Sequence, residues 1–257
     1  MDINISPLIF RIFSLILGLC LGSFYNVCIH RYLWGESIVS PPSHCPKCGH
    51  RLSWWENIPV VSFIILRGKC HACGEDISPL YPIVEIISGL WSLSIAWKFG
   101  LSVPYLIYLI FGGLFIIMSF IDFISYILPD IITIPGAILA FAVSHFLDIS
   151  FIESALGAIM GAGIFFIIQK LYKGLRGIEG MGGGDIKLMI LIGALLGVYA
   201  IPFVVFFGAL TGLLASIIYL IKDSSEGMST KIPFGPFLCM GAMTFILFKD
   251  AILKLYT

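Results

Sequence analysis

Long apolar runs, separated by short polar stretches, dominate the hydrophobic pattern of this chain. A helix needs about 20 mostly apolar residues to cross a bilayer core of roughly 30 Å. Eight runs bounded by charge, proline or glycine approach that length: residues 8–30, 83–97, 105–121, 131–146, 152–171, 186–199, 201–221 and 233–248. The pattern therefore predicts an all-α polytopic membrane protein with about eight transmembrane helices. Because residues 186–221 are too long for one span, we expect a helix break near Pro202.

The composition indicates that lipid is the main solvent of this 257-residue chain. Hydrophobic residues make up 59% of it and charged residues 12%, about half the charged share of an average soluble domain. Lysine plus arginine and aspartate plus glutamate number 15 each, so the formal net charge is zero. A nucleic-acid partner would favour a basic excess, so we expect membrane lipid and no nucleic acid among the partners.

The basic residues predict the orientation of the helices, because cytoplasmic loops are enriched in lysine and arginine. With the N-terminus outside, the cytoplasmic face holds eleven of them: Arg31, Lys47, Arg51, Arg67, Lys69, Lys170, Lys173, Arg176, Lys187, Lys222 and Lys231. The outer face holds four: Arg11, Lys98, Lys249 and Lys254. We therefore expect a first transmembrane helix (1–30), a cytoplasmic loop domain (31–82) and a transmembrane domain (83–257). No basic residue precedes the first apolar run, which favours a retained span over a removed signal peptide.

Two cysteine pairs, Cys45-Pro-Lys-Cys48 and Cys70-His-Ala-Cys73, lie in the loop domain and are separated by 21 residues (70 − 48 − 1). This spacing is typical of a zinc site in which four thiolates form a closed tetrahedral shell. We expect a structural Zn²⁺ that stabilises a loop too small to bury much core, with unmetallated cysteines as the alternative. Three neighbouring histidines are expected beside the metal rather than bound to it: His44, His50 and His71.

Of the acidic residues within or at the ends of apolar runs, where a charge is costly and often functional, three are candidates for a functional site. They are Glu85, Asp122 and Asp185, the last directly after a run of three glycines. Two carboxylates that share one proton can activate water and protonate a leaving group, as in aspartic proteases. The alternatives are a helix N-cap for Asp185 and an interfacial carboxylate in water for Asp122. We expect Asp130, after Pro129, to cap the fourth predicted helix.

Several motifs resemble, in order, those of bacterial type IV prepilin peptidases, which are bifunctional leader peptidases and N-methyltransferases. They are Gly22-Ser-Phe-Tyr-Asn-Val27, Cys45-Pro-Lys-Cys-Gly-His50, Trp55-Glu-Asn-Ile-Pro59, Ile77-Ser-Pro-Leu-Tyr-Pro82, Asp122 to Asp130, Gly182-Gly-Gly-Asp-Ile-Lys-Leu188 and Pro233-Phe-Gly-Pro236. The run that ends at Asp185 also resembles the G-x-G-D signature of presenilin-type intramembrane proteases. The resemblance implies that Asp122 and Asp185 are the catalytic pair and that residues 83–257 form an aspartic peptidase domain.

The resemblance also implies an enzyme of the bacterial inner membrane whose active site faces the cytoplasm. Its substrates would be prepilin or pseudopilin precursors, cut after the glycine that ends a basic leader. The new N-terminal residue, usually phenylalanine, would then be N-methylated with S-adenosylmethionine as the methyl donor. No Rossmann-type motif locates the donor, so we expect it near Glu56, Asn57 and Glu85. Leu80 departs from the arginine that the family usually has at this position.

Two other classes of protein fit parts of the pattern. An ion- or proton-coupled transporter would also place acidic residues and glycine-rich breaks at membrane depth. A zinc-stabilised membrane adaptor without catalysis would explain the cysteines but would leave the two aspartates without a role. Cleavage of a prepilin by the purified protein separates the peptidase from both.

Overall fold

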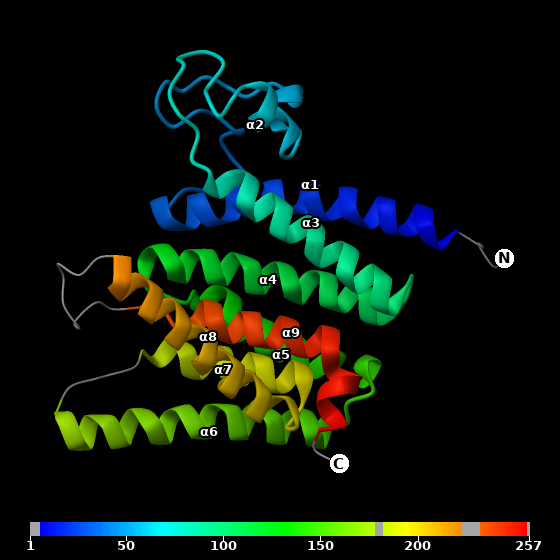
Figure 1. The fold of residues 1–257 in the computed structure, drawn as a ribbon, viewed down its shortest axis with the longest axis vertical. Helices are drawn as coiled ribbons and strands as arrows, with labels where there is room; N and C mark the ends of the chain where they lie inside the picture. The colour runs from blue at the N-terminus through cyan, green and yellow to red at the C-terminus, as the bar shows by residue number, and fades with distance from the viewer. Residues whose placement is uncertain (1–5, 178–181, 223–231, 256–257) are drawn as a thin grey trace. The chain divides into compact units, whose positions relative to one another are not determined.

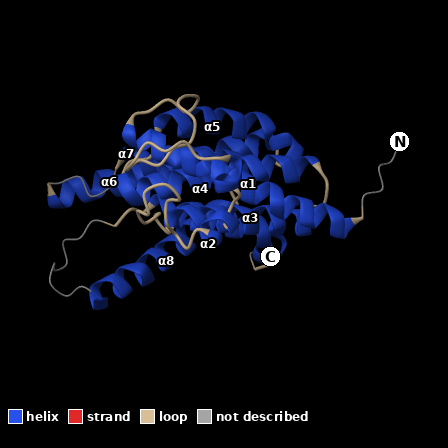
Figure 2. Cartoon of the chain, turned by 90° about the horizontal axis from the view of Figure 1, so that it is seen from above, coloured by secondary structure: helices blue, strands red, loops and turns tan. Residues whose placement is uncertain are grey.

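The computed structural model describes residues 6–177, 182–222 and 232–255, and within these ranges every regular element is a helix (Figures 1 and 2). The α-helices are α1 (Pro7–Trp34), α2 (Val61–Ile65), α3 (Leu80–Phe99), α4 (Val103–Ser125), α5 (Asp130–Val143), α6 (Phe151–Arg176), α7 (Gly183–Leu196), α8 (Ala200–Lys222) and α9 (Gly235–Leu253). Two short 3₁₀ helices are η1 (Trp54–Asn57) and η2 (Ser144–Leu147). The predicted all-α class is confirmed.

All eight predicted apolar segments are helical, and seven helices of the described residues are long and apolar enough to cross a membrane. The eighth segment is α7, which has 14 residues and therefore rises about 21 Å, less than the thickness of a bilayer core. Every residue of α7 from Leu191 to Leu196 is buried. Its apolar run therefore fills a protein core, which periodicity alone does not distinguish from a membrane span.

Large apolar side chains on the outer faces of the long helices are exposed. Ile131 of α5 is 75% exposed and Ile152 of α6 is 72% exposed, and many others exceed half. Apolar surface of this extent is unfavourable in water and requires a lipid environment. The chain is therefore a multi-pass membrane protein.

By its internal contacts the chain forms two compact units, residues 1–117 and residues 118–257, and α4 runs from the first into the second. In the first unit, α1 and α3 pack closely along small residues (Figure 1). A Cβ atom added to Gly18 would lie 2.6 Å from the carbonyl oxygen of Ser88, and one added to Gly22 would lie 2.6 Å from Cα of Glu85. Glycine at these positions therefore lets the two backbones touch, as in other membrane helix pairs.

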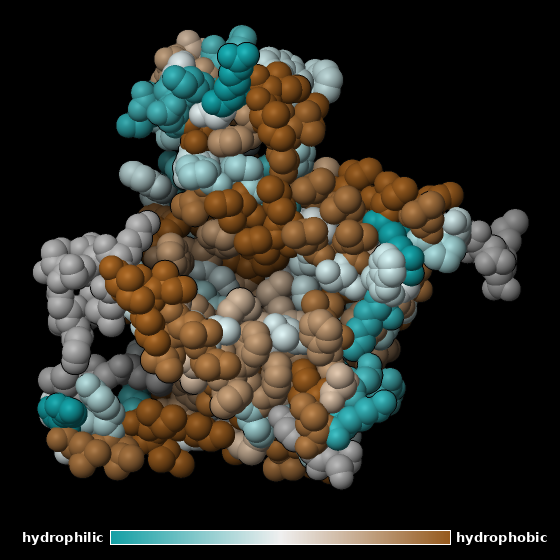
Figure 3. Space-filling view, in the orientation of Figure 1, coloured by the Kyte–Doolittle hydropathy of each residue, from teal (hydrophilic) through white to brown (hydrophobic). Residues whose placement is uncertain are grey.

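The segment between α1 and α3 forms a cysteine module, which we define as residues 35–79. It contains η1, α2 and two isolated β-bridges, which join His44 to Arg51 and Lys69 to Asp76. Figure 3 shows hydrophilic side chains over part of this module and an apolar patch beside them, and Ile64 and Ile65 of α2 are exposed apolar residues of the module. The predicted polar loop therefore folds as a small unit with its own turns.

In the second unit, α7 packs against α5, α6, α8 and α9. Its closest approach is to α6, where a Cβ atom added to Gly157 would lie 2.4 Å from the carbonyl oxygen of Gly193. The Ser154 hydroxyl of α6 also donates to the carbonyl of Ala194 at 2.7 Å. α7 ends at Gly197, whose φ of +78° suits glycine, and α8 begins at Ala200. The predicted break near Pro202 is confirmed.

Candidate active site and metal centre

Asp122 lies in the last turn of α4 and is 5% exposed. Its Oδ2 accepts a hydrogen bond of 3.1 Å from the backbone N–H of Gly235, the first residue of α9. A Cβ atom added to Gly235 would lie only 2.6 Å from that same oxygen. The absence of a side chain at this position therefore allows α9 to approach and hold the carboxylate, which rules out the alternative of a carboxylate free in interfacial water.

Asp185 is the third residue of α7. The N-cap position is occupied by Gly182, and no side chain caps the helix, so the N-cap alternative for Asp185 is wrong. A carboxylate in the first turn of a helix is favoured by the helix dipole. The glycine before it passes close to the loop that follows α4, since a Cβ atom added to Gly184 would lie 3.0 Å from Cβ of Leu128.

The two aspartates belong to the same unit and share neighbours. Leu128 lies beside both Gly184 and Gly235, each of which adjoins one aspartate. The carboxylate of Asp122 is within range of a direct electrostatic interaction with Asp185. Cys239 of α9, which is 1% exposed, is within the same range of both. The second unit therefore gathers the two candidate catalytic residues from α4 and α7 around a buried surface of α9.

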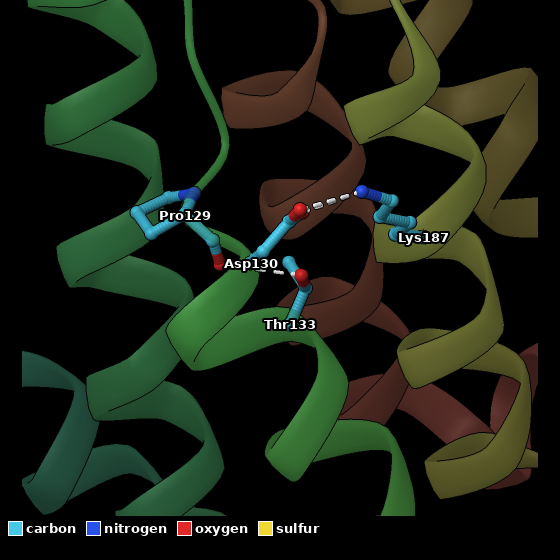
Figure 4. Close-up of polar contacts among 4 residues, drawn as sticks. All are labelled: Pro129, Asp130, Thr133 and Lys187. Carbon is cyan, nitrogen blue, oxygen red and sulfur yellow. Dashed lines mark hydrogen bonds and ion pairs between the residues drawn. The ribbon is translucent and has the colours of Figure 1, made fainter.

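An ion pair lies beside this site (Figure 4). The Lys187 ammonium of α7 donates to Oδ1 and Oδ2 of Asp130, at 2.7 Å each. Asp130 is the first residue of α5 and Pro129 is at the N-cap position, so the expectation that Asp130 caps this helix is wrong. The Thr133 hydroxyl, which donates to the carbonyl of Pro129 at 3.2 Å, closes the first turn instead. The Asp130 carboxylate is thereby free to bind a partner on α7.

The four predicted metal ligands come together in the cysteine module. The sulfur atoms of Cys45, Cys48, Cys70 and Cys73 lie within 4.8 Å of one another. Each pair is followed by a glycine with positive φ, +72° at Gly49 and +73° at Gly74, whose N–H donates back to the first cysteine of its pair at 2.9 Å. This donor set and these turns fit a tetrahedral Zn²⁺.

Backbone N–H groups also favour the thiolate form of one of these cysteines. The N–H groups of Cys73 and Ala72 point at Cys70 and lower the pKa of its thiol to about 6. A thiolate is the form that binds zinc, so this turn favours the ligating state near neutral pH.

The residues expected near the methyl donor have well-defined partners. Oε2 of Glu56 accepts from the backbone N–H of Ser53 at 2.7 Å and lies 3.3 Å from Nε2 of His50. The N–H of Ser53 is the main cause of a lowered pKa at Glu56. Glu85 of α3 binds a residue close to Asn57 in sequence: its Oε2 accepts a hydrogen bond of 2.7 Å from the backbone N–H of Val60. Asn57 is exposed between these two contacts.

The neighbouring histidines lie beside the cysteine cluster, as expected. His71 packs edge-on against Trp55 at 5.4 Å between ring centroids, and His50, Glu56 and His71 approach one another within 4.8 Å. His44 Nδ1 lies 3.0 Å from the carbonyl of Pro42. These contacts support the module around its cysteines.

Comparison with known proteins agrees with this geometry. Residues 16–99 match the model of the Bacterial Peptidase A24 N-terminal domain, and residues 109–217 match that of the Type IV leader peptidase family. The prepilin leader peptidase/N-methyltransferase of Pseudomonas putida is 34% identical, over 96% of this chain and 93% of that protein. Proteins of the same name from Pseudomonas aeruginosa (97% and 94% covered) and Neisseria gonorrhoeae (92% and 90%) are also 34% identical.

The chain belongs to the type IV leader peptidase family. No solved structure matches it.

One residue of the candidate site has no role assigned by the sequence analysis. Gly235 lies outside both matched regions, 16–99 and 109–217, although its N–H is the hydrogen-bond donor to Asp122. The signal that could have found it is the motif Pro233-Phe-Gly-Pro236, in which the glycine directly precedes a proline at the start of a helix. Its partner is 113 residues away, so only the fold reveals the contact.

Proposed function

We propose that this chain cleaves the leader from type IV prepilins or pseudopilins and methylates the N-terminus that cleavage exposes. The observation that carries the proposal is the approach of Asp122, held by the N–H of Gly235, to Asp185 at the start of α7. Membership of the leader peptidase family supports it. No comparison points to a transporter, and an adaptor would not need two gathered carboxylates.

For cleavage, one aspartate would act as the general base and the other as the general acid. The ionised carboxylate takes a proton from water as the water oxygen attacks the carbonyl carbon of the leader glycine. The protonated carboxyl gives its proton to the carbonyl oxygen, which forms a neutral tetrahedral intermediate. As this intermediate collapses, the carboxyl that took the proton from water gives it to the amine of the mature pilin, the C–N bond breaks, and the other carboxylate takes back a proton from one hydroxyl of the intermediate as the glycine carboxyl forms. That amine is the group to be methylated.

We propose that the site lies on the cytoplasmic side of the bacterial inner membrane. The basic residues of the chain favour this orientation, because eleven of the 15 lie on the cytoplasmic face in the topology that the sequence predicts. A basic prepilin leader would remain at the same face, while the apolar helix that follows it stays in the bilayer.

We propose that Glu56, Asn57 and Glu85 contribute to holding S-adenosylmethionine. This donor supplies an electrophilic methyl group and carries positive charge on its sulfonium and amino groups, which carboxylates complement. Glu56 fits this role because its Oε1 is buried and has no hydrogen-bond partner, while Oε2 is fixed by Ser53. The lowered pKa keeps this carboxylate ionised at neutral pH. Glu85 orients the segment after Asn57 through its bond to Val60.

We further propose that Cys45, Cys48, Cys70 and Cys73 hold a structural Zn²⁺. The closed set of four thiolates leaves no open position for substrate, so the metal would stabilise the module without taking part in the reaction.

The decisive experiment uses the purified chain in detergent with a synthetic prepilin and S-adenosylmethionine labelled on its methyl group. We expect cleavage after the leader glycine and transfer of label to the new N-terminus. Glu56→Gln and Asn57→Ala should lower methylation of a substrate that is already cleaved, while cleavage of the full prepilin persists. If the wild-type protein does neither reaction, the proposed function is wrong; if both variants methylate normally, only the location of the donor is wrong.

A further inference from the structure

The two candidate catalytic aspartates lie at helix ends, each next to a segment with unusual backbone freedom or conformation. Asp185 directly follows Gly182, Gly183 and Gly184, which contribute no side chains to packing. Asp122 is in the last turn of α4, and the loop after it contains Tyr126 at a φ of +58° before α5 begins. Glycine runs have the highest conformational freedom of any sequence. A mechanism that needs two carboxylates at one distance therefore requires a constraint between these segments.

The ion pair between Asp130 and Lys187 supplies such a constraint. Asp130 is eight residues after Asp122 (130 − 122), and Lys187 is two residues after Asp185 (187 − 185). Figure 4 shows the Lys187 side chain of α7 extended toward the Asp130 carboxylate at the start of α5. Both carboxylate oxygens lie 2.7 Å from the ammonium nitrogen. The pair thus links the two chain segments close to the residues that react.

We propose that Asp130 and Lys187 are positioning residues that hold the first turn of α7, and with it Asp185, at a fixed distance from Asp122. The proposal rests on the proposed peptidase function. An ordinary exposed ion pair contributes about 0–1 kcal/mol to stability, and these side chains are 58% and 41% exposed. The stability of the fold should therefore change little without the pair. Catalysis is more sensitive, because a displacement of about 1 Å can cost roughly 100-fold in rate.

The test measures prepilin cleavage by the full chain in detergent for Lys187→Met, Asp130→Asn and the charge-exchanged double variant Asp130→Lys, Lys187→Asp. We expect each single variant to lower kcat about tenfold with little change in KM, and the double variant to recover most of the loss. Asp76→Asn is the matched control, since it removes an exposed carboxylate that pairs with Lys69 in the cysteine module. It should leave cleavage unchanged.

The pH profile separates positioning from a general loss of structure. Two close carboxylates repel, which drives their macroscopic pKa values apart and widens the bell-shaped profile of kcat. If the single variants let the aspartates separate, the bell should narrow. Cys239 of α9 is a further titratable group beside the pair and is the same in all variants.

Three results would overturn the proposal: wild-type kcat in both single variants, a kcat of the double variant no higher than that of the single variants, or a pH profile of unchanged width. Thermal unfolding shows whether each single variant folds. If one does not, the charge-exchanged variant decides: a folded double variant that does not recover kcat contradicts the proposal. If instead Asp122→Asn and Asp185→Asn cleave normally, the peptidase assignment itself has failed.

Discussion

The cysteine module and the second helical unit hold their functional groups in different ways. In the module, four sulfurs come from two short turns of nearly identical geometry, and the turns themselves place the sulfurs within 4.8 Å. In the second unit, two carboxylates come from helices 63 residues apart in sequence (185 − 122), and helix packing at glycines brings them together. A local site of the first kind tolerates changes elsewhere in the fold. A site of the second kind depends on every close contact between its helices.

The largest effect should follow from changing the aspartates themselves. Asp122→Asn and Asp185→Asn keep the size of the side chain but remove the base, so each should lower cleavage by about 10⁴-fold or more. Cleavage by wild-type and variant proteins, with zinc content as a check of folding, measures this loss.

A matched control is Asp148→Asn in the same unit. Asp148 adopts a φ of +55°, which asparagine also tolerates, so this variant should cleave normally. Substantial cleavage by a folded Asp122 or Asp185 variant would remove that aspartate from the mechanism.

Loss of the zinc ligands should destabilise the cysteine module more than the rest of the protein. Binding of a structural zinc contributes about 10–16 kcal/mol to folding in small zinc domains. The double variant Cys45→Ser, Cys48→Ser should therefore contain no zinc, and its module should become sensitive to proteolysis. Metal analysis and limited proteolysis of the purified protein test this, and Cys20→Ser, which lies outside the cluster, is the control. Undiminished zinc in the double variant would exclude these cysteines as ligands.

An intermediate effect is expected at Gly235. In Gly235→Ala the new methyl group would lie 2.6 Å from Oδ2 of Asp122, so the carboxylate must move and its hydrogen bond must weaken. A displacement of this size should lower kcat about 100-fold while the protein remains folded.

Gly163→Ala is the matched control, because a Cβ atom there meets nothing within 4 Å and alanine suits a helix better than glycine. Equal cleavage by the two alanine variants would show that the contact of α9 with Asp122 is dispensable.

The smallest effect concerns the pH dependence of the module. The N–H of Ser53 lowers the folded-state pKa of Glu56, so the bond stabilises the fold above the unfolded pKa of about 4.3. That contribution is lost as the pH falls through the folded pKa. Glu56→Gln should therefore unfold about 1–2 kcal/mol more easily than wild type at pH 6, a difference that shrinks below about pH 4. Denaturant unfolding followed by tryptophan fluorescence measures it in proteins whose tryptophans outside the module, Trp34, Trp91 and Trp97, are replaced by phenylalanine. A difference independent of pH would contradict the prediction.

The sequence predicted the helices and the clustering of the four paired cysteines well, because both depend on local pattern. Helices lie at all eight predicted apolar segments, and the spacing of the two cysteine pairs alone predicts that their four sulfur atoms come together. The candidate dyad was predicted from the acidic residues at membrane depth and from the motif resemblance, and in the structure Asp122 and Asp185 lie within electrostatic range of each other. The interpretation of Asp130 was wrong because a proline–aspartate pair before a helix is typical of a cap, whereas this carboxylate pairs with a lysine on α7.

By itself, the sequence determined that this protein is helical, lies in lipid, and carries two closely spaced cysteine pairs and a few acidic residues at membrane depth. Hydrophobic burial and the clustering of paired cysteines depend on residue type and short spacing, so the sequence alone predicts them. Only the tertiary structure decided that α7 is a buried helix, that Gly235 holds Asp122, and that Lys187 binds Asp130. These contacts join residues 57 to 113 positions apart. They depend on which helix faces come together, and the packing of the whole unit determines this.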